Sequence, residues 1–271
     1  MFPHSRQSAA GVCLAIEPVL LAIETAGSAC SAAVARGDTV LAAECRALRH
    51  GHAEALFPMI ERVMQKAGLS PSQLGAVAAA LGPGGFTGIR VGLAAAHGIA
   101  LAVGARLVGV SSFAAVAACM AGRRVAAAGG SGEQTLLVAL DSRRADLYVQ
   151  LFALGTASPL AAPQALIADR LADYVASGTP SLPGDAPLLI AGDAAEAAAT
   201  ALRGRSAIAV ADNSAPNAEG VLAAALRQLR CDAPAGAPAN PVRPLYLRAP
   251  DVTLPKVTPA QRPHRIPAGA R

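Results

Sequence analysis

One glycine-rich segment, ALGPGGFTGIRVGLAAAHGIAL at residues 80–101, constrains the fold more than any other part of this sequence. It follows an apolar run at 76–81 that is predicted to be a strand, and it leads into a long helix predicted over 87–103, with Thr87 as N-cap. Small residues recur every four positions along this helix, at Gly88, Gly92, Ala96, Ala100 and Gly104. Because each interior glycine costs a helix about 1 kcal/mol relative to alanine, this stripe indicates close packing on the sheet or on a partner helix.

The loop at the start of this helix allows two interpretations. It lies between a strand and a helix N-terminus, where free N–H groups and the helix dipole favour an anion. A Walker A loop needs a lysine that the segment lacks, and Thr87 stands where a dinucleotide-binding fingerprint has its third glycine. Spacing alone therefore leaves a phosphate cradle and a plain tight turn as equal alternatives.

The predicted elements follow the order of an α/β protein with two related halves. In the first half, strands are expected at Val19–Glu24, 31–34, 39–45, 76–81 and Arg106–Val110, and helices at 52–67 and 87–103. In the second series, a helix capped by Ser111 or Ser112 precedes strands at 135–140 and 145–152, a helix at 163–176, and alternating strands and helices at 187–191, 194–203, 207–210 and 215–229. This order places residues 19–112 and about 213–230 in a first half-domain, and residues 113–212 in a second.

The two ends of the chain differ from this pattern. Residues 1–18 are interpreted as an N-terminal extension, and residues 231–271 as a tail rich in proline and arginine with one short ordered segment, RPLYLR at 243–248. No run of about twenty uncharged apolar residues is present, so no membrane span is expected. The five cysteines form no C-x-x-C pair, which argues against a disulfide framework or a structural zinc site and favours the cytoplasm.

The net charge of +5 suits nucleic acid or anionic partners only weakly. The arginines are scattered, with short pairs at 123–124 and 143–144, and no aromatic residues interleave with them. We therefore expect any contact of this chain with nucleic acid to be indirect or weak.

Residues suited to catalysis are sparse. No two histidines stand three or four positions apart, no H-E-x-x-H and no G-x-S-x-G is present, and no metal site is expected. Glu24 and Asp141 each end a predicted strand at the lip of a sheet. In actin-like ATPases, acids at these two places hold metal and water around a nucleotide, whereas the simpler interpretation is that each caps a turn.

Five segments together carry a specific resemblance. LLAIETAGSACSAAVA, HGHAEALFPMIERVM, ALGPGGFTGIRVGLAAAHGIAL, LVGVSSFAAVA and LDSRRADLYVQLF occur in this order. They resemble the bacterial TsaB family, also called YeaZ, a subunit of the tRNA threonylcarbamoyladenosine machinery. The resemblance is strong over 19–152 and weaker up to residue 248, where PLYLR matches the closing motif of the family.

This resemblance implies an actin/hexokinase-like fold of two related half-domains, with mixed sheets flanked by helices. It also implies a relationship to the catalytic subunit TsaD, which transfers a threonylcarbamoyl group to the N6 of an adenosine in tRNA. TsaD carries an H-x-x-x-H metal motif after its glycine-rich helix, where this chain reads GVSSFAAVAACM without a histidine. The expected role is therefore that of an inactive scaffold without a cofactor of its own, with ATP or ADP only at an interface of the complex.

The implied partners are a TsaD-type transferase, a TsaE-type ATPase and a second copy of the chain. The partner-facing surface is expected on the helices at 52–67 and 87–103, at His52, Leu56, Met59, Ile60, Arg90, Gly92, Leu93, Ala96, His97 and Ala100. A bulky residue at Gly92 is expected to break the pairing and spare the fold. A residual nucleotide or anion site is expected at Glu24, Thr25, Gly82, Gly84, Gly85 and Thr87. A metal- or nucleotide-dependent hydrolase and a nucleotide-binding regulator without turnover stay as alternatives.

Overall fold

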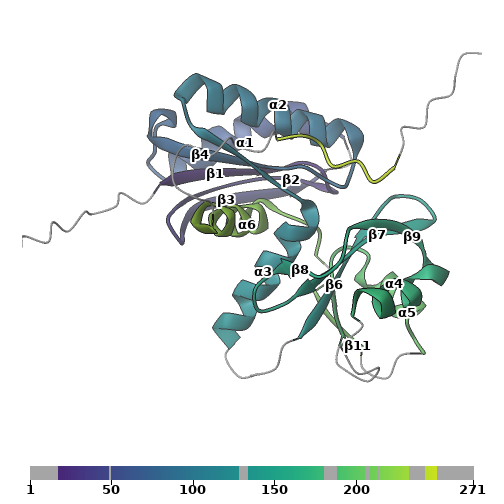
Figure 1. Cartoon of the computed structure of the whole chain (residues 1–271). Helices are drawn as coiled ribbons and strands as arrows, with labels where there is room; N and C mark the ends of the chain where they lie inside the picture. The colour runs from purple at the N-terminus through teal and green to yellow at the C-terminus, as the bar shows by residue number, and fades with distance from the viewer. Residues whose placement is uncertain are drawn as a thin grey trace, which may run out of the picture.

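The computed structural model describes residues 18–48, 50–127, 134–179, 188–204, 208–212, 214–231 and 242–248, and it shows two α/β halves (Figure 1). The expected N-terminal extension, apart from Pro18, and most of the C-terminal tail lie outside these residues. Each half is built around one mixed sheet with helices packed on it, which confirms the predicted α/β class.

The first sheet has five strands in the order β3-β2-β1-β4-β5. These strands are β1 (Val19–Glu24), β2 (Ala29–Arg36), β3 (Thr39–Ala47), β4 (Leu74–Ala80) and β5 (Arg106–Val110). The first three form an antiparallel meander, and β4 and β5 then add in parallel to β1. Helices α1 (His52–Lys66) and α2 (Phe86–Val103) cover one face of this sheet, and α6 (Ala218–Cys231) covers the other (Figure 1).

Glycines let α2 lie directly on this sheet. A Cβ atom at Gly88 would overlap the carbonyl oxygen of Thr25, and one at Gly92 would overlap the Thr25 hydroxyl. The same hydroxyl donates a hydrogen bond of 2.7 Å to the carbonyl oxygen of Gly88, so the Thr25 side chain, directly after β1, is bonded to the backbone of the helix. Of the two alternatives left by the sequence, the first four residues of the stripe, Gly88, Gly92, Ala96 and Ala100, therefore pack on the chain's own sheet, whereas Gly104 is the exposed C-cap of α2.

The start of α2 differs from the prediction. Its N-cap is Gly85, and Thr87 lies exposed inside the first turn, because the chain already enters helical geometry at Phe86. Among the described residues, α2 is also the one helix long and apolar enough to cross a membrane. Its buried residues pack on the first sheet.

The second sheet has the order β11-β10-β6-β7-β8, and β9 also pairs with β7. Its strands are β6 (Thr135–Asp141), β7 (Asp146–Ala153), β8 (Ser158–Pro159), β9 (Gln164–Ile167), β10 (Leu188–Ala191) and β11 (Ile208–Asp212). Helix α3 (Ser112–Ala127) packs on the face that bears Leu136 and Val138. Helices α4 (Leu171–Gly178) and α5 (Ala195–Ala201) pack on the opposite face.

The helix predicted at 163–176 is wrong in its first half. Residues Gln164–Ile167 form β9, a short 3-10 turn follows at Ala168–Arg170, and only α4 is helical. Strand β9 pairs antiparallel with β7 over four residues, so hydrogen bonds to a distant strand outweigh local helix propensity.

The two halves meet where α3 crosses α6. The Ser111 hydroxyl accepts the N–H of Ala114 at 3.0 Å, so Ser111 is the residue that caps α3. A Cβ atom at Gly220 of α6 would lie only 2.6 Å from the carbonyl oxygen of Ala115, so this glycine lets the two helices approach closely.

The described end of the tail, residues 242–248, returns to the first half, where the N–H of Leu245 donates to the carbonyl oxygen of Leu81 at 2.8 Å (Figure 1).

Candidate functional site

A cleft of about 280 Å³ lies between the two halves. The first half lines it with the turn after β1 and with the glycine-rich loop before α2, and the second half lines it with the loop after β6. The lining residues are Ala26, Gly27, Ser28, Pro83, Gly84, Gly85, Leu140, Asp141, Ser142, Arg143, Asp193 and Pro216. Of the six residues predicted for a nucleotide or anion site, Gly84 and Gly85 line this cleft. That these two residues bind a nucleotide or anion stays a prediction.

Glu24 and Thr25 lie beneath the cleft and shape its wall. One carboxylate oxygen of Glu24 accepts the N–H groups of Ala26 and Gly27 at 2.5 and 3.0 Å, so Glu24 caps the turn after β1. The second oxygen has no hydrogen-bond partner among the described atoms. Both residues are buried. Neither residue is among those that line the cleft, and their part in a binding site stays a prediction.

One backbone N–H group of the glycine-rich loop is already hydrogen-bonded within the chain and is not available to an anion. The N–H of Gly85 donates to the carbonyl oxygen of Ala26 at 2.7 Å. A Cβ atom at Gly84 would overlap the same oxygen, so the loop and the turn lie in direct contact. Gly82 is buried behind the loop and Thr87 points outward, and neither lines the cleft. This geometry matches the tight-turn interpretation better than a phosphate cradle.

The charges in the cleft are mixed. Asp193 accepts the N–H of Asp141 at 2.9 Å, and burial together with the charge of Asp141 raises the pKa of Asp193. Arg143 has left-handed backbone geometry, with φ of 59°, and its guanidinium donates to the carbonyl oxygen of Gly27 at 3.2 Å. The cleft therefore presents two carboxylates and one guanidinium together.

Metal-ligating residues do not gather in the described parts of the chain. Helix α3, where TsaD has its two metal-binding histidines, carries none, and no group of three or more His, Cys, Asp or Glu side chains is placed to hold an ion. The expectation that this chain has no metal site stays a prediction.

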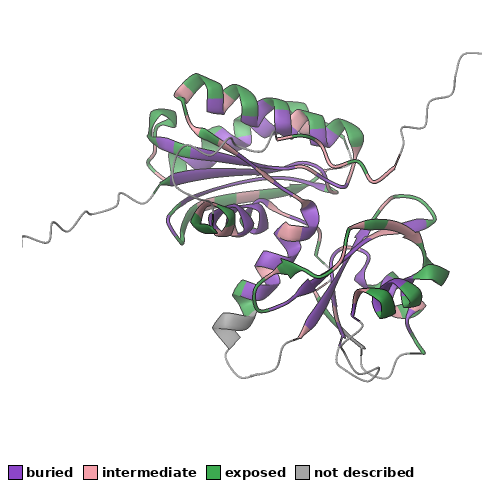
Figure 2. Ribbon diagram, viewed as in Figure 1, coloured by how far each residue is buried: buried purple, intermediate pink, exposed green. Residues whose placement is uncertain are grey.

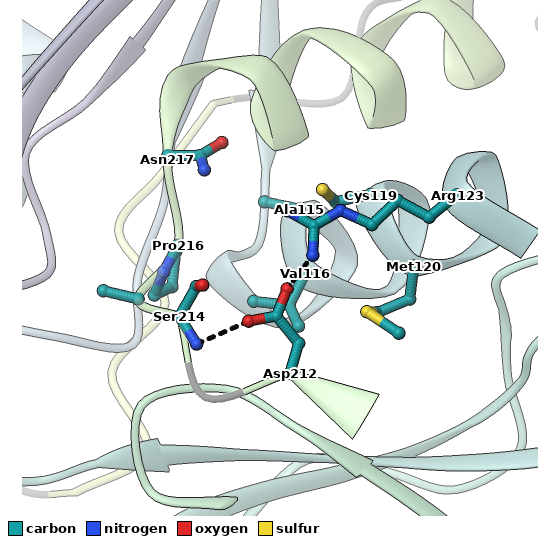
Figure 3. A pocket seen from close by; sticks show the side chains of 10 residues that line it. Ala115, Val116, Cys119, Met120, Arg123, Asp212, Ser214, Pro216 and Asn217 are labelled. Atoms are coloured by element: carbon teal, nitrogen blue, oxygen red, sulfur yellow. Dashed lines mark hydrogen bonds and ion pairs between the residues drawn. The ribbon is translucent and has the colours of Figure 1, made fainter. Parts of the chain in front are cut away.

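A second hollow, beside α3, is too small for a ligand (Figure 3). It has a volume of about 20 Å³, enough for one water molecule. Arg123 of α3 forms an ion pair there with Asp212, which also accepts the N–H of Ser214 at 2.7 Å. Burial opposes ionisation, but the hydrogen bonds from Ser214 and the charge of Arg123 hold the pKa of Asp212 below its ordinary value. This pair fastens the end of β11 to α3.

The expected partner surface needs a correction. Seven of its ten residues are buried against the chain's own sheet, namely Leu56, Met59, Ile60, Gly92, Leu93, Ala96 and Ala100. His52 is half-buried at the start of α1, and burial lowers its pKa. Only Arg90 and His97 lie on the exposed side of α2. The helical periodicity was identified correctly, but the side chains on it face the core.

Sequence reasoning missed the residues on the outer face of the same two helices. Phe57 of α1 is 53 % exposed, and Phe86 and Leu101 of α2 are 52 % and 86 % exposed. Figure 2 shows that the side of α2 away from the sheet is exposed along much of its length. Leu101 follows His97 by four positions, so a search for apolar residues opposite the small-residue stripe would have found it.

The comparisons with known proteins agree with this architecture. The family described as "TsaD: tRNA N6-adenosine threonylcarbamoyltransferase" matches residues 46–246. The tRNA threonylcarbamoyladenosine biosynthesis protein TsaB of Escherichia coli is 33 % identical over 129 residues, which are 48 % of this chain and 52 % of that protein. The TsaB protein of Bacillus subtilis is 27 % identical over 133 residues, or 49 % and 54 % of the two chains. The chain thus spans about half the length of the curated relatives it matches.

Among solved structures, YeaZ from Pseudomonas aeruginosa matches with a TM-score of 0.67 and 25 % identity, covering 85 % of this chain and all of that one. This match shows that the chain has the fold of YeaZ. The chain therefore belongs to the tRNA N6-adenosine threonylcarbamoyltransferase family, and within it to the TsaB/YeaZ type.

Proposed function

We propose that this chain is a non-catalytic subunit of the machinery that attaches a threonylcarbamoyl group to the N6 of adenosine 37 in tRNAs reading codons that begin with A. In this proposal it works in the cytoplasm and binds a TsaD-type transferase, and the pair recruits a TsaE-type ATPase. The chain contacts tRNA indirectly or weakly and holds no cofactor alone, so ATP or ADP enters only at an interface of the complex.

The chemistry of the chain supports a role without catalysis. Helix α3 has no histidine, the N–H of Gly85 is bonded to Ala26, and Glu24 is used to cap a turn. On this basis the purified chain should transfer no threonylcarbamoyl group to tRNA, whereas the complex with the TsaD-type and TsaE-type subunits should. Measurable transfer by the chain alone would contradict the proposal.

The observation that carries the partner-binding role is the outer face of α1 and α2. Its apolar side chains project away from the sheet, and Leu101 has the largest exposed fraction of the exposed large hydrophobic residues among the described residues. Large exposed apolar side chains on neighbouring elements are typical of protein interaction sites. The buried faces of the same helices fix their position, so this surface is rigid before the partner arrives.

Leu101→Arg should weaken binding of a purified TsaD-type subunit by at least about tenfold, because the interface would have to desolvate a new charge. Size-exclusion chromatography and isothermal titration calorimetry would measure the effect. Leu160→Arg is the matched control, since Leu160 is 44 % exposed on the second half. If Leu101→Arg binds as tightly as this control, the outer face of α2 is not the interface. The same variants run alone report whether the chain pairs with itself there.

A nucleotide-binding regulator without turnover is the second candidate function. It is favoured by the 280 Å³ cleft, where Asp141 and Asp193 face the glycine-rich loop. Titration with ADP and magnesium, alone and with the TsaD-type partner, separates the two candidates. If the chain is a scaffold, ADP should give a binding heat only when the partner is present. If it is a regulator, ADP should give a binding heat with the chain alone, and Asp193→Asn should abolish that heat.

A further inference from the structure

One described segment, residues 242–248 near the C-terminal end, contacts both halves of the molecule. We call these seven residues the clamp. It runs past the start of α2 toward the second half (Figure 1). Its residues belong to neither sheet, and the function proposed above makes no use of them.

The clamp is anchored to the first half by three kinds of contact. The N–H of Leu245 donates to the carbonyl oxygen of Leu81 at 2.8 Å. The ring of Tyr246 stacks on Phe86 with 5.8 Å between centroids, and its hydroxyl accepts a hydrogen bond of 3.2 Å from Arg90. The guanidinium of Arg90 also lies 3.7 Å from the centre of the Phe86 ring. These contacts hold the clamp against the loop before α2 and against the first turn of α2.

The next two residues of the clamp reach the second half. Leu247 packs against the core between α3 and β6. Arg248 forms an ion pair with Asp146, the first residue of β7, and its guanidinium lies 5.7 Å from the ring centre of Tyr148. The side chain of Asp146 is 12 % exposed and that of Arg248 is 28 % exposed, so solvent screens this pair less than a surface pair.

Both anchors adjoin residues that line the cleft between the halves. The hydroxyl of Ser142 lines the cleft and donates to Asp146 at 2.7 Å, so Arg248 and Ser142 share one carboxylate. On the other side, Leu81 is two residues before Pro83, which also lines the cleft. We propose that the clamp holds the two walls of the cleft at a fixed separation, in addition to the packing of α3 on α6 and the hydrogen bond from Arg143 to Gly27.

Amide hydrogen–deuterium exchange of the full-length chain, read by mass spectrometry, tests this coupling reciprocally. Arg248→Ala removes the anchor on the second half, and we expect amide exchange at residues 84–86 of the first half to rise about three- to tenfold. Tyr246→Ala cuts the anchor on the first half, and we expect a similar rise in residues 142–146. Exchange in β1 and β6 should stay unchanged in both variants.

Arg243→Ala is the matched control, because Arg243 is an exposed arginine of the same segment without an ion pair to a described residue. It should exchange like the unaltered chain. A single thermal transition close to that of the unaltered chain shows that each variant is folded. If each variant raises exchange only beside its own substitution, the contacts act locally, and the proposal that the clamp couples the two halves is wrong.

Discussion

Replacing Gly88 with alanine should lower the free energy of unfolding by about 3–5 kcal/mol, because the new methyl group would overlap the carbonyl oxygen of Thr25. The atom in the way belongs to the backbone of Thr25, the residue directly after β1, and the pairing of β1 with β2 and β4 limits how far this residue can move. The helix cannot lift away without losing the hydrogen bond from Thr25 to Gly88. Urea unfolding followed by circular dichroism would measure the change.

Gly98 supplies the matched control on the same helix. A Cβ atom there meets nothing within 4 Å, and the residue is exposed. Gly98→Ala should therefore raise the free energy of unfolding by about 1 kcal/mol, as a plain gain in helix propensity. Equal effects of the two substitutions would mean that α2 does not lie on the sheet through Gly88.

The same contact changes how Gly92 can be used. The sequence suggested a bulky residue there as a probe of partner binding that spares the fold. In the structure even a methyl group at Gly92 would overlap the Thr25 hydroxyl, so such a variant would disturb the core first. Exposed positions such as Leu101 are the correct probes.

The unaltered chain should lose stability as the pH rises from 5 to 8, and Glu24→Gln should abolish most of this loss. Burial, opposed by the N–H groups of Gly27 and Ala26 and reinforced by the charge of Asp193, raises the pKa of Glu24 from 4.5 to about 7. Between these two values the folded chain keeps a proton that the unfolded chain has released. The contribution of neutral Glu24 is thus complete below about pH 4.5 and is lost by about pH 7 or 8, a change of about 3 kcal/mol.

Glutamine is uncharged throughout this range and can still accept the two N–H groups through its carbonyl oxygen. We therefore expect Glu24→Gln to match the unaltered chain at pH 5 and to be more stable at pH 8, in urea unfolding at a series of pH values. Glu54→Gln, at an exposed position of α1, should keep the original pH profile. If Glu24→Gln keeps that profile too, Glu24 does not titrate in this range.

Local signals in the sequence correctly predicted the elements that are determined by their own residues and by contacts with residues close in sequence. The buried run Val19–Glu24 is β1 as expected. The sequence pattern Ser70-x-x-Gln73 is typical of a capping box, and the N–H of Ser70 donates to the Gln73 side chain at 2.8 Å, as such a box requires. β5 has the predicted limits, Arg106–Val110. In each case propensity, capping and burial favour the same structure.

The parts that sequence did not predict depend on distant segments. Strand β9 forms because β7 offers it an edge, and no local pattern around Gln164–Ile167 reports that edge. The stripe on α2 was consistent with a sheet or a partner, since small residues allow either approach equally. The side of the helix that faces solvent became clear only when Gly88 was placed against Thr25. The cleft likewise needs both halves and has no local signature.

The position of α6 has a consequence for how the chain is made. This helix comes after the whole second half in sequence, yet its buried residues Val221, Leu222 and Ala225 complete the core of the first. On a ribosome, the sheet built from residues 19–110 therefore keeps one apolar face uncovered until residue 231 has left the exit tunnel. The second half, contiguous between α3 and β11, can close its own core earlier. The half that is synthesised first is thus the last to finish folding.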